Sequence, residues 1–262
     1  MFLNNINLKH KLKFNLKKKY AKKKGKILVR HKQKGHKSLY RNINFQHNIK
    51  SKNLIIGIEY DPYRSNFITK LLTKNKNRYN YNYIPSTNRL DILQNVNNFS
   101  NENYKKNNSI FLKNISIGDF ICNVQKYPNK PSVFARSAGT FAQVLDVSKV
   151  RNDLIKIQLP SKEQYFISKN CKANLGKNSN SFNKYLKKWK AGKSRHIGRR
   201  PKVRGVAKNP VDHPHGGGEG KTSPGKPPVT PQGRLTRNVS TRKKKKNNFF
   251  IALKRIKKNE KI

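Results

Sequence analysis

Acidic residues are scarce in this chain. Its 262 residues include 11 Asp+Glu against 61 Lys+Arg, which gives a formal net charge of +50. No acid precedes Glu59, and only Asp212, Glu219 and Glu260 follow Glu163. A compact protein with this excess repels itself, and a polyanion relieves that repulsion. Because Lys and Arg displace the counterions condensed on phosphates, the composition predicts a nucleic-acid partner rather than an ordinary solvated surface.

Cysteines and long apolar runs are also lacking. Cys122 and Cys171 are too few for a disulfide framework, so we expect both thiols in the core. No apolar run reaches membrane-spanning length, so no membrane partner is expected. The N-terminus has no signal-peptide apolar region. Lys, Asn, Ile, Phe and Tyr are abundant, as in products of small AT-rich genomes. This predicts synthesis inside an organelle, where no import signal is needed.

The charge pattern divides the chain into an arm, a globular middle and a tail. Residues 1–45 form a basic arm in which Lys and Arg alternate with Tyr20, His31 and Tyr40. Cations of this kind serve phosphates, and flat rings can stack on unpaired bases. Residues 193–262 form a second basic segment, dominated by Gly, Pro, Lys and Arg. We expect both ends to be extended and to become ordered on a partner.

Alternating apolar residues in the middle predict a mainly β protein. Short strands are expected at 54–60, 66–73, 79–84 and 115–124, which would close one small barrel within residues 46–125. A second β unit over 126–192 has strands expected at 139–147, 153–159 and 164–168. Residues 181–196 favour a short helix that places Tyr185 and Trp189 four residues apart.

The stretch "NPVDHPHGGGEGKTSPGKPP" (209–228) is the most distinctive motif. His215 stands where a Walker loop needs its first glycine, and the following prolines exclude the helix that such a loop requires. A zinc site would need a second ligand set at a recognised spacing, and a histidine-dependent hydrolase would need a nucleophile or paired carboxylates. Two interpretations remain, a flexible tail or an extended segment threaded through folded RNA, where glycine permits close backbone approach.

Longer motifs resemble one known family. The segment "GVAKNPVDHPHGGGEGKT" (205–222) closely resembles the hallmark of the ribosomal protein L2 family of the large subunit, in its bacterial and organellar branch. Further segments follow in the family's order: "GKILVRHKQKGHKSLYR" (25–41), "IEYDPYRS" (58–65), "FARSAGT" (134–140), "CKANLGK" (171–177) and "AGKSRHIGRRPKVRG" (191–205). The resemblance covers nearly the whole chain beyond residue 24. Residues 74–109 match poorly, Lys34 stands in a part that is richer in glycine in the family, and Lys162 occupies a turn that usually holds glycine.

The resemblance implies an oligonucleotide/oligosaccharide-binding (OB) fold over 46–125, an SH3-like barrel over 126–192, and basic ends buried in large-subunit rRNA. It implies roles in subunit assembly and association, in tRNA binding and in support of the peptidyl transferase centre. His213 matches the family histidine associated with that centre. Because bond formation is attributed to RNA, we interpret His213 as a structural or electrostatic contact, and the protein as no enzyme.

The candidate RNA-binding residues combine motif match with charge. They are Arg30, His31, His36, Lys37, Tyr40, Arg41, Arg136, Ser137, Lys193, Arg195, Arg199, Arg200, Lys202, Arg204, His213, His215, Gly216, Gly217, Gly218 and Lys221.

The expected partners are large-subunit rRNA, neighbouring ribosomal proteins and the small subunit, without homo-oligomerisation. No metal site or cofactor is expected beyond magnesium ions associated with the rRNA. The expected compartment is the mitochondrion rather than the plastid. A free-standing OB-type binder of single-stranded nucleic acid is the alternative function.

Overall fold

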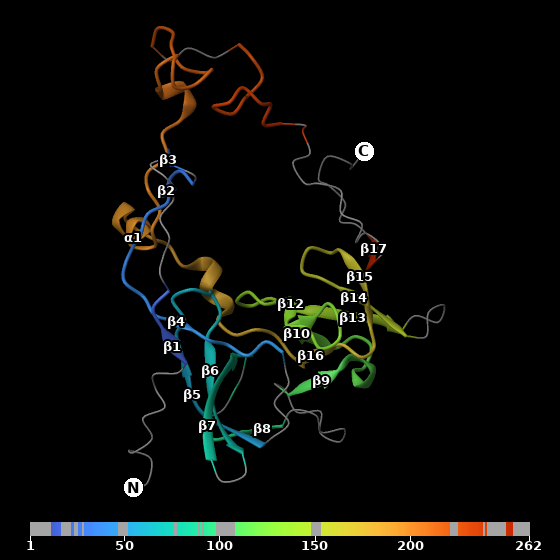
Figure 1. The fold of residues 1–262 in the computed structure, drawn as a ribbon. Coiled ribbons are helices and arrows are strands. Elements are labelled where there is room, and N and C mark those ends of the chain that lie inside the picture. The colour runs from blue at the N-terminus through green and yellow to red at the C-terminus, as the bar shows by residue number, and fades with distance from the viewer. Residues whose placement is uncertain are drawn as a thin grey trace. The chain divides into compact units, whose positions relative to one another are not determined.

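The protein consists of two compact units in a computed structural model (Figure 1). The structure describes residues 12–16, 22–23, 26–27, 29–46, 52–75, 78–88, 90, 92–97, 108–147, 153–220, 225–237, 239 and 250–253. The first unit comprises Met1–Lys17, Ser38–Lys187 and Asn247–Ile262, and the second comprises Lys18–Lys37 and Lys188–Lys246. The chain therefore leaves the first unit twice and returns to it twice. The predicted arm of residues 1–45 is divided between the two units.

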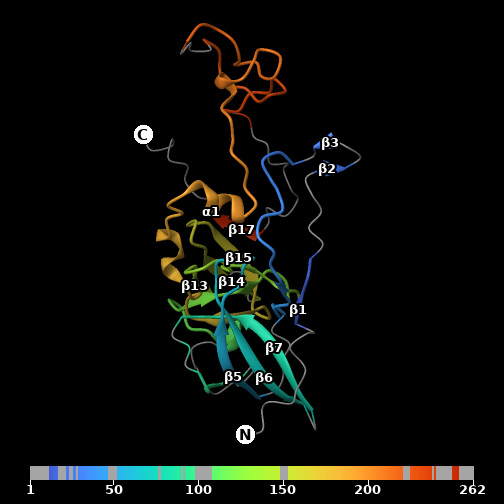
Figure 2. The same ribbon diagram turned by 90° about the vertical axis from the view of Figure 1, so that its left-hand side faces the viewer.

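The first sheet has four antiparallel strands in the order β7-β6-β5-β8. Its long strands, visible side by side in Figures 1 and 2, are β5 (Lys52–Glu59), β6 (Ile68–Asn75) and β7 (Arg78–Pro85), and the short β8 is Asn95–Asn97. Side chains alternate between the two faces, as the strand period requires. Ile55 and Leu71 are fully buried on one face, and a second cluster contains Ile43, Ile68 and Tyr83.

The second sheet has seven strands in the order β17-β15-β14-β13-β10-β16-β9. It holds the larger core, in which Ile121, Val144, Ile155 and Ile157 are fully buried. Its strands are β9 (Ser109–Phe111), β10 (Phe120–Cys122), β13 (Ala142–Val147), β14 (Leu154–Gln158), β15 (Gln164–Ser168), β16 (Lys172–Leu175) and β17 (Ile251–Leu253).

Three two-stranded ribbons complete the β structure. They pair β1 (Lys13–Phe14) with β4 (Tyr40–Arg41), β2 (Lys22–Lys23) with β3 (Lys26–Ile27), and β11 (Val124–Gln125) with β12 (Ser132–Phe134). The mainly β architecture predicted from the sequence is confirmed.

The strand pairing corrects one assignment. β9 and β10 pair with β16 in the second sheet, so the prediction that residues 115–124 complete the first barrel is wrong. A turn spans Ser116–Asp119, preceded by a 3-10 helix over Leu112–Asn114. Strands of both sheets carry the same alternation of apolar residues, so the pattern predicts a strand but not its sheet. By pairing, the second sheet begins before residue 126.

A buried polar network joins the two sheets of the first unit. Asn178, 1% exposed, accepts hydrogen bonds at Oδ1 from the amides of Asn66 (3.3 Å) and Asn123 (3.1 Å). Its own amide donates to the Ala135 carbonyl at 2.6 Å and to the Thr140 hydroxyl at 3.4 Å. Backbone bonds reinforce the junction, because residues 177–180 run beside residues 86–88. The side chain of Asn178 thus connects elements far apart in the sequence.

Helical structure is sparse and interrupted. The helix expected over 181–196 is two pieces, a 3-10 helix over Ser181–Tyr185 and α1 over Ala191–His196. Trp189 lies between them with a left-handed φ of 50°, so Tyr185 and Trp189 do not share a helix face. Consecutive lysines supply no apolar face that would bury such a helix. A 3-10 helix also spans Gly205–Ala207.

The two cysteines are buried, as expected. Cys122 and Cys171 are both free thiols with no exposed area. Burial raises the pKa of both, that of Cys171 to about 11, so the neutral thiol persists at physiological pH. Among the residues that the structure describes, no helix is long and apolar enough to cross a membrane.

Candidate nucleic-acid interface

The arm and the tail meet within the second unit. Lys32 and Arg199 form an antiparallel bridge, and backbone bonds on either side extend it: Gln33 N–H to the Gly198 carbonyl (2.9 Å), His36 N–H to the His196 carbonyl (2.7 Å) and Arg200 N–H to the His31 carbonyl (3.0 Å). Two segments separated by about 165 residues thus hold each other in a defined path.

Two glycines permit this close crossing. Gly35 has φ +64°, and a Cβ atom there would collide with the backbone of His196 and Gly198. Gly198 has φ +89°, and its Cβ would lie 2.5 Å from the Gln33 carbonyl oxygen. Both the left-handed backbone and the contact distance therefore require glycine. Lys34 stands in a part of the arm that is richer in glycine in the family. Gly35 nevertheless permits the close approach of the arm backbone to the tail backbone.

The crossing presents cations outward. His31 is half-buried, with a left-handed φ of 61°, and its Nδ1 lies 2.9 Å from the Pro201 carbonyl oxygen, so it fixes the backbone. Arg195 is also half-buried. Exposed candidates of the crossing are Arg30, His36, Lys37, Lys193, Arg199, Arg200, Lys202 and Arg204. In the described part of the chain, both ion pairs, Lys13–Glu59 and Arg64–Asp61, lie in the first unit.

The aromatic ring of Tyr40 packs against other side chains of the first unit. The Tyr40 ring packs against Phe14 and Tyr63, with centroids at 5.2 and 5.4 Å, and its hydroxyl accepts a 2.7 Å hydrogen bond from Arg64. Tyr40 therefore supports the first sheet, and its expected role as a base-stacking ring is not favoured. Arg41 is half-buried and donates to the Leu39 carbonyl at 3.2 Å.

Arg136 and Ser137 lie exposed on the loop after β12. The guanidinium of Arg136 lies 3.9 Å from the centroid of the Phe45 ring, a cation–π contact that orients it. Desolvation and the nearby charge of Arg64 lower the pKa of Arg136, although the group stays protonated at physiological pH. An oriented, exposed guanidinium can meet a phosphate with little loss of rotamer entropy. Arg64, which the sequence analysis missed, lies in the same cluster within the "DPYRS" turn.

The histidine motif folds back on itself rather than extending. Residues 205–217 form consecutive turns, visible in the orange segment of Figures 1 and 2. His213 Nδ1 accepts the His215 backbone N–H at 3.0 Å, and His215 Nε2 accepts the Val229 N–H at 2.8 Å. The two rings stack with centroids 5.1 Å apart. Within the extended tail, residues 205–217 therefore form a local turn region, because the ring nitrogens of His213 and His215 accept backbone N–H groups.

The acceptor roles define the state of both rings. A ring nitrogen that accepts an N–H must be unprotonated, so the remaining proton lies on His213 Nε2 and on His215 Nδ1. His213 is buried, at 7% exposure. Desolvation, followed by the electrostatic effect of His215 and Lys208 on the protonated ring, lowers its pKa. The remaining nitrogen of His213 is a donor rather than a base, which agrees with the interpretation of His213 as structural.

Acidification is expected to loosen this loop. Because the folded state lowers the His213 pKa, the stabilisation is present above the unfolded pKa of about 6.5 and is lost as the pH falls through the lower, folded value. Amide hydrogen exchange on the full chain should show the protection factor of the His215 N–H falling severalfold between about pH 7.5 and about pH 5.5. His213→Gln, whose side-chain oxygen accepts without titrating, should abolish the pH dependence, and an unchanged dependence in this variant would contradict the assignment.

The glycines of the motif pack against the chain itself. A Cβ on Gly216 would collide with the carbonyl oxygens of Lys208 and Asn209, and one on Gly217 (φ +85°) would lie 2.7 Å from Pro210 Cγ. Gly218 also has a left-handed φ, of 94°. The close approach predicted here thus occurs within the protein. Lys221 lies outside the described residues.

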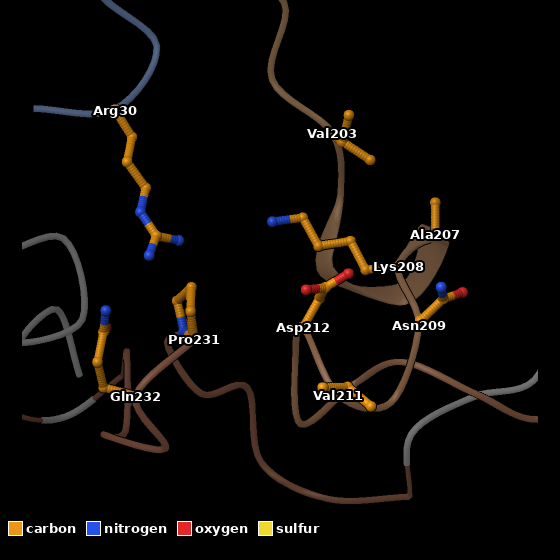
Figure 3. Close-up of a pocket in the computed structure, with 9 residues that line it drawn as sticks. All are labelled: Arg30, Val203, Ala207, Lys208, Asn209, Val211, Asp212, Pro231 and Gln232. Atoms are coloured by element: carbon orange, nitrogen blue, oxygen red, sulfur yellow. The ribbon is translucent and has the colours of Figure 1, made fainter. Parts of the chain in front are cut away.

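A cavity of about 710 Å³ opens beside the motif (Figure 3). Arg30 lines it from the arm, Lys208 and Asp212 from the motif, and Val203, Val211 and Pro231 add apolar surface. Of these residues, Arg30 was predicted from the sequence as an RNA-binding candidate. The sequence did not indicate Lys208 as a site residue, because a single lysine is not distinctive in a strongly basic chain.

The described residues gather no group of three or more His, Cys, Asp and Glu side chains that could hold a metal ion. With both histidines already accepting backbone N–H groups, their available nitrogens are protonated. This geometry suits hydrogen-bond donation and phosphate neutralisation.

Comparison with known proteins agrees with this geometry. The family profile "Ribosomal Proteins L2, RNA binding N-terminal domain" matches residues 9–97, and "Ribosomal Proteins L2, C-terminal domain" matches residues 105–233. The gap between the two matches precedes β9, in agreement with the strand pairing.

Individual relatives extend the match along the chain. Large ribosomal subunit protein uL2m of Reclinomonas americana is 43% identical over 228 residues, 87% of this chain and 80% of that protein. Large ribosomal subunit protein uL2 of Buchnera aphidicola is 43% identical over 230 residues (87% and 81%), and that of a Wolbachia pipientis strain is 40% identical over 223 residues (85% and 80%). The chain therefore belongs to the ribosomal protein L2 family, whose two domains are an OB-fold and an SH3-like barrel.

Proposed function

We propose that this protein is a structural, non-enzymatic component of the large ribosomal subunit that binds large-subunit rRNA. The observation that carries the proposal is the second unit, where arm and tail hold each other through backbone bonds and leave their cations exposed. Such a surface neutralises crowded phosphates, while its folded path gives shape selectivity. The match to both L2 domains supports the same conclusion.

The finer functions follow the family resemblance. We infer contacts with neighbouring ribosomal proteins and with the small subunit, support of tRNA binding, and a position of the histidine motif near the peptidyl transferase centre. His213 would act there by shaping the loop, since its ring already accepts a backbone N–H. The protein would bind as a single copy. The mitochondrion is the proposed compartment, supported by the uL2m relative and by the AT-rich residue usage, although bacterial relatives are similarly close.

Cofractionation tests the function. The protein should migrate with large subunits through moderate salt, at about 0.2 M, because many phosphate contacts act together. A free-standing single-strand binder should wash off under the same conditions, and a histidine-dependent hydrolase should show turnover as purified protein without RNA. Absence of the protein from gradient-purified large subunits would contradict the proposal.

One exposed cation should contribute modestly and measurably. Arg200 is anchored through its backbone N–H to the His31 carbonyl, and its side chain is exposed. Arg200→Gln should weaken binding to an rRNA fragment a fewfold and reduce the slope of log K against log salt by about 1. Lys177→Gln is the matched control, because that ammonium already lies 4.5 Å from the Phe120 and Phe141 ring centroids. Equal changes of slope in both variants would argue against Arg200 as a phosphate contact.

A further inference from the structure

Asp212 is an acidic residue within the otherwise strongly basic surface of the second unit. In the sequence of the second unit, the acids are Asp212 and Glu219. Within the described residues Asp212 forms no ion pair, and its carboxylate has no side-chain hydrogen bond. A carboxylate that faces RNA repels phosphate and lowers affinity. Its place beside a cavity therefore indicates a ligand that offers hydrogen-bond donors.

The cavity beside Asp212 combines opposite charges with apolar surface. Figure 3 shows Lys208 and Asp212 projecting from the motif on one side and Arg30 projecting from the arm on the other. Val211, which is 97% exposed, and Pro231 supply apolar surface. The volume of about 710 Å³ exceeds that of one nucleotide and lies in the range of about 300–1,000 Å³ typical of small-ligand sites.

The walls of the cavity are held in place. Arg30 precedes the residues that pair with the tail at Lys32 and Arg199. Pro231 lies in a hairpin that His215 anchors through the Val229 N–H. The backbone N–H of Asp212 donates to the Asn209 carbonyl at 3.0 Å. The charged groups therefore start from fixed backbone positions, which lowers the entropy lost on binding.

The donor and acceptor pattern selects one base. Unpaired bases of RNA are read on their Watson–Crick edges. Guanine alone offers two adjacent N–H donors, at N1 and N2, that match both oxygens of a carboxylate, together with an O6 acceptor for an ammonium. Cytosine and adenine offer one amino group, and uracil flanks its single N–H with carbonyl oxygens that repel a carboxylate.

We propose that the cavity holds one unpaired guanine nucleotide of rRNA. Asp212 accepts from N1–H and N2–H, Lys208 donates to O6, and Arg30 meets the phosphate. The inference rests on the proposed rRNA-binding function and adds a base preference to it. Recognition would occur at the junction of arm and tail, so the RNA strand would contact both segments at once.

Fluorescence anisotropy with the full chain tests the base preference. The probes are short RNA hairpins with one bulged nucleotide, G, A, C, U or inosine, at about 0.2 M salt to suppress non-specific binding. The G bulge should bind about tenfold tighter than the others, since a good bidentate contact discriminates by about 5- to 150-fold. Inosine, which lacks the N2 amino group, should lose most of the preference. Asp212→Asn should abolish the preference and leave the salt dependence unchanged.

Glu219→Gln is the matched control, because it removes the same charge from the motif outside the cavity. It should raise affinity slightly for every hairpin and preserve the preference for G. If both variants raise affinity equally for all hairpins, Asp212 acts by charge alone and the inference fails. It also fails if the effect of Asp212→Asn requires Mg²⁺ and ignores the base, since the carboxylate would then hold a cation. Salt-dependent binding without base preference would leave the proposed function intact, whereas absence of RNA binding would overturn both.

Discussion

Asn178→Ala is expected to lower the free energy of unfolding of the first unit by about 2–4 kcal/mol, because two buried and two partly buried hydrogen bonds and a side-chain volume are lost together. The Asn178 side chain accepts from the Asn66 and Asn123 amides and donates to the Ala135 carbonyl and the Thr140 hydroxyl. Loss of this link therefore loosens both sheets. Urea denaturation of the purified chain in moderate salt measures the change. Asn170→Ala, at an exposed turn, should change stability by less than about 0.5 kcal/mol.

Asn178→Asp separates hydrogen bonding from cavity formation. The carboxylate has nearly the same shape and still accepts from Asn66 and Asn123. It cannot donate to the Ala135 carbonyl, which lies 2.6 Å from the present amide nitrogen, and it places a charge in a buried site. We expect it to be at least as destabilising as alanine at neutral pH. If aspartate were tolerated while alanine was not, packing rather than the polar network would hold the sheets together.

Gly216→Ala is expected to reduce incorporation into large subunits by about 5- to 150-fold. The new Cβ collides with the Lys208 and Asn209 carbonyl oxygens, and backbone atoms cannot yield as a flexible side chain could. Relief requires the turn around His213 to shift, at a cost of about 1–3 kcal/mol that competes directly with assembly. A mixed-expression experiment, in which variant and parent compete for the same subunits, measures the ratio by mass spectrometry.

Gly192→Ala provides the matched control for this substitution. Neither glycine has a positive φ, and a Cβ on Gly192 meets nothing within 4 Å, so its variant should assemble normally. Hydrogen exchange on free Gly216→Ala protein then locates the cause. Loss of protection at the His215 amide would show that the clash lies within the protein. Unchanged protection combined with failed assembly would show instead that RNA makes the close approach at this glycine.

Much of the fold was predictable because alternation of apolar residues is a local signal. The strands at 54–60, 79–84, 153–159 and 164–168 match β5, β7, β14 and β15 closely. Sheet membership was not predictable, since β10 pairs with β16 about 50 residues later and the local pattern carries no information about its partner. The short helix expected within 181–196 is present as α1, but it does not include Tyr185 and Trp189, because the lysine-rich sequence between them offers no apolar face to bury.

The candidate site was predictable in its composition and less so in its geometry. Arg199 and Arg200 followed from charge and motif, and the structure places both exposed at the arm–tail crossing. Charge cannot reveal that His213 and His215 accept backbone N–H groups, because that depends on where the chain turns. The hydrogen bond from Arg64 to the Tyr40 hydroxyl was not predictable for the same reason, since a ring in a basic segment gives no indication that Arg64 lies beside it.

The return of β17 to the second sheet has a further consequence. Pairing with β15 fastens the chain beyond the tail, just as β1 and β4 fasten both sides of the arm. Each basic segment therefore continues into the first unit at both of its ends. A loop with fixed ends samples fewer conformations than a free tail, so less entropy is lost when it is immobilised.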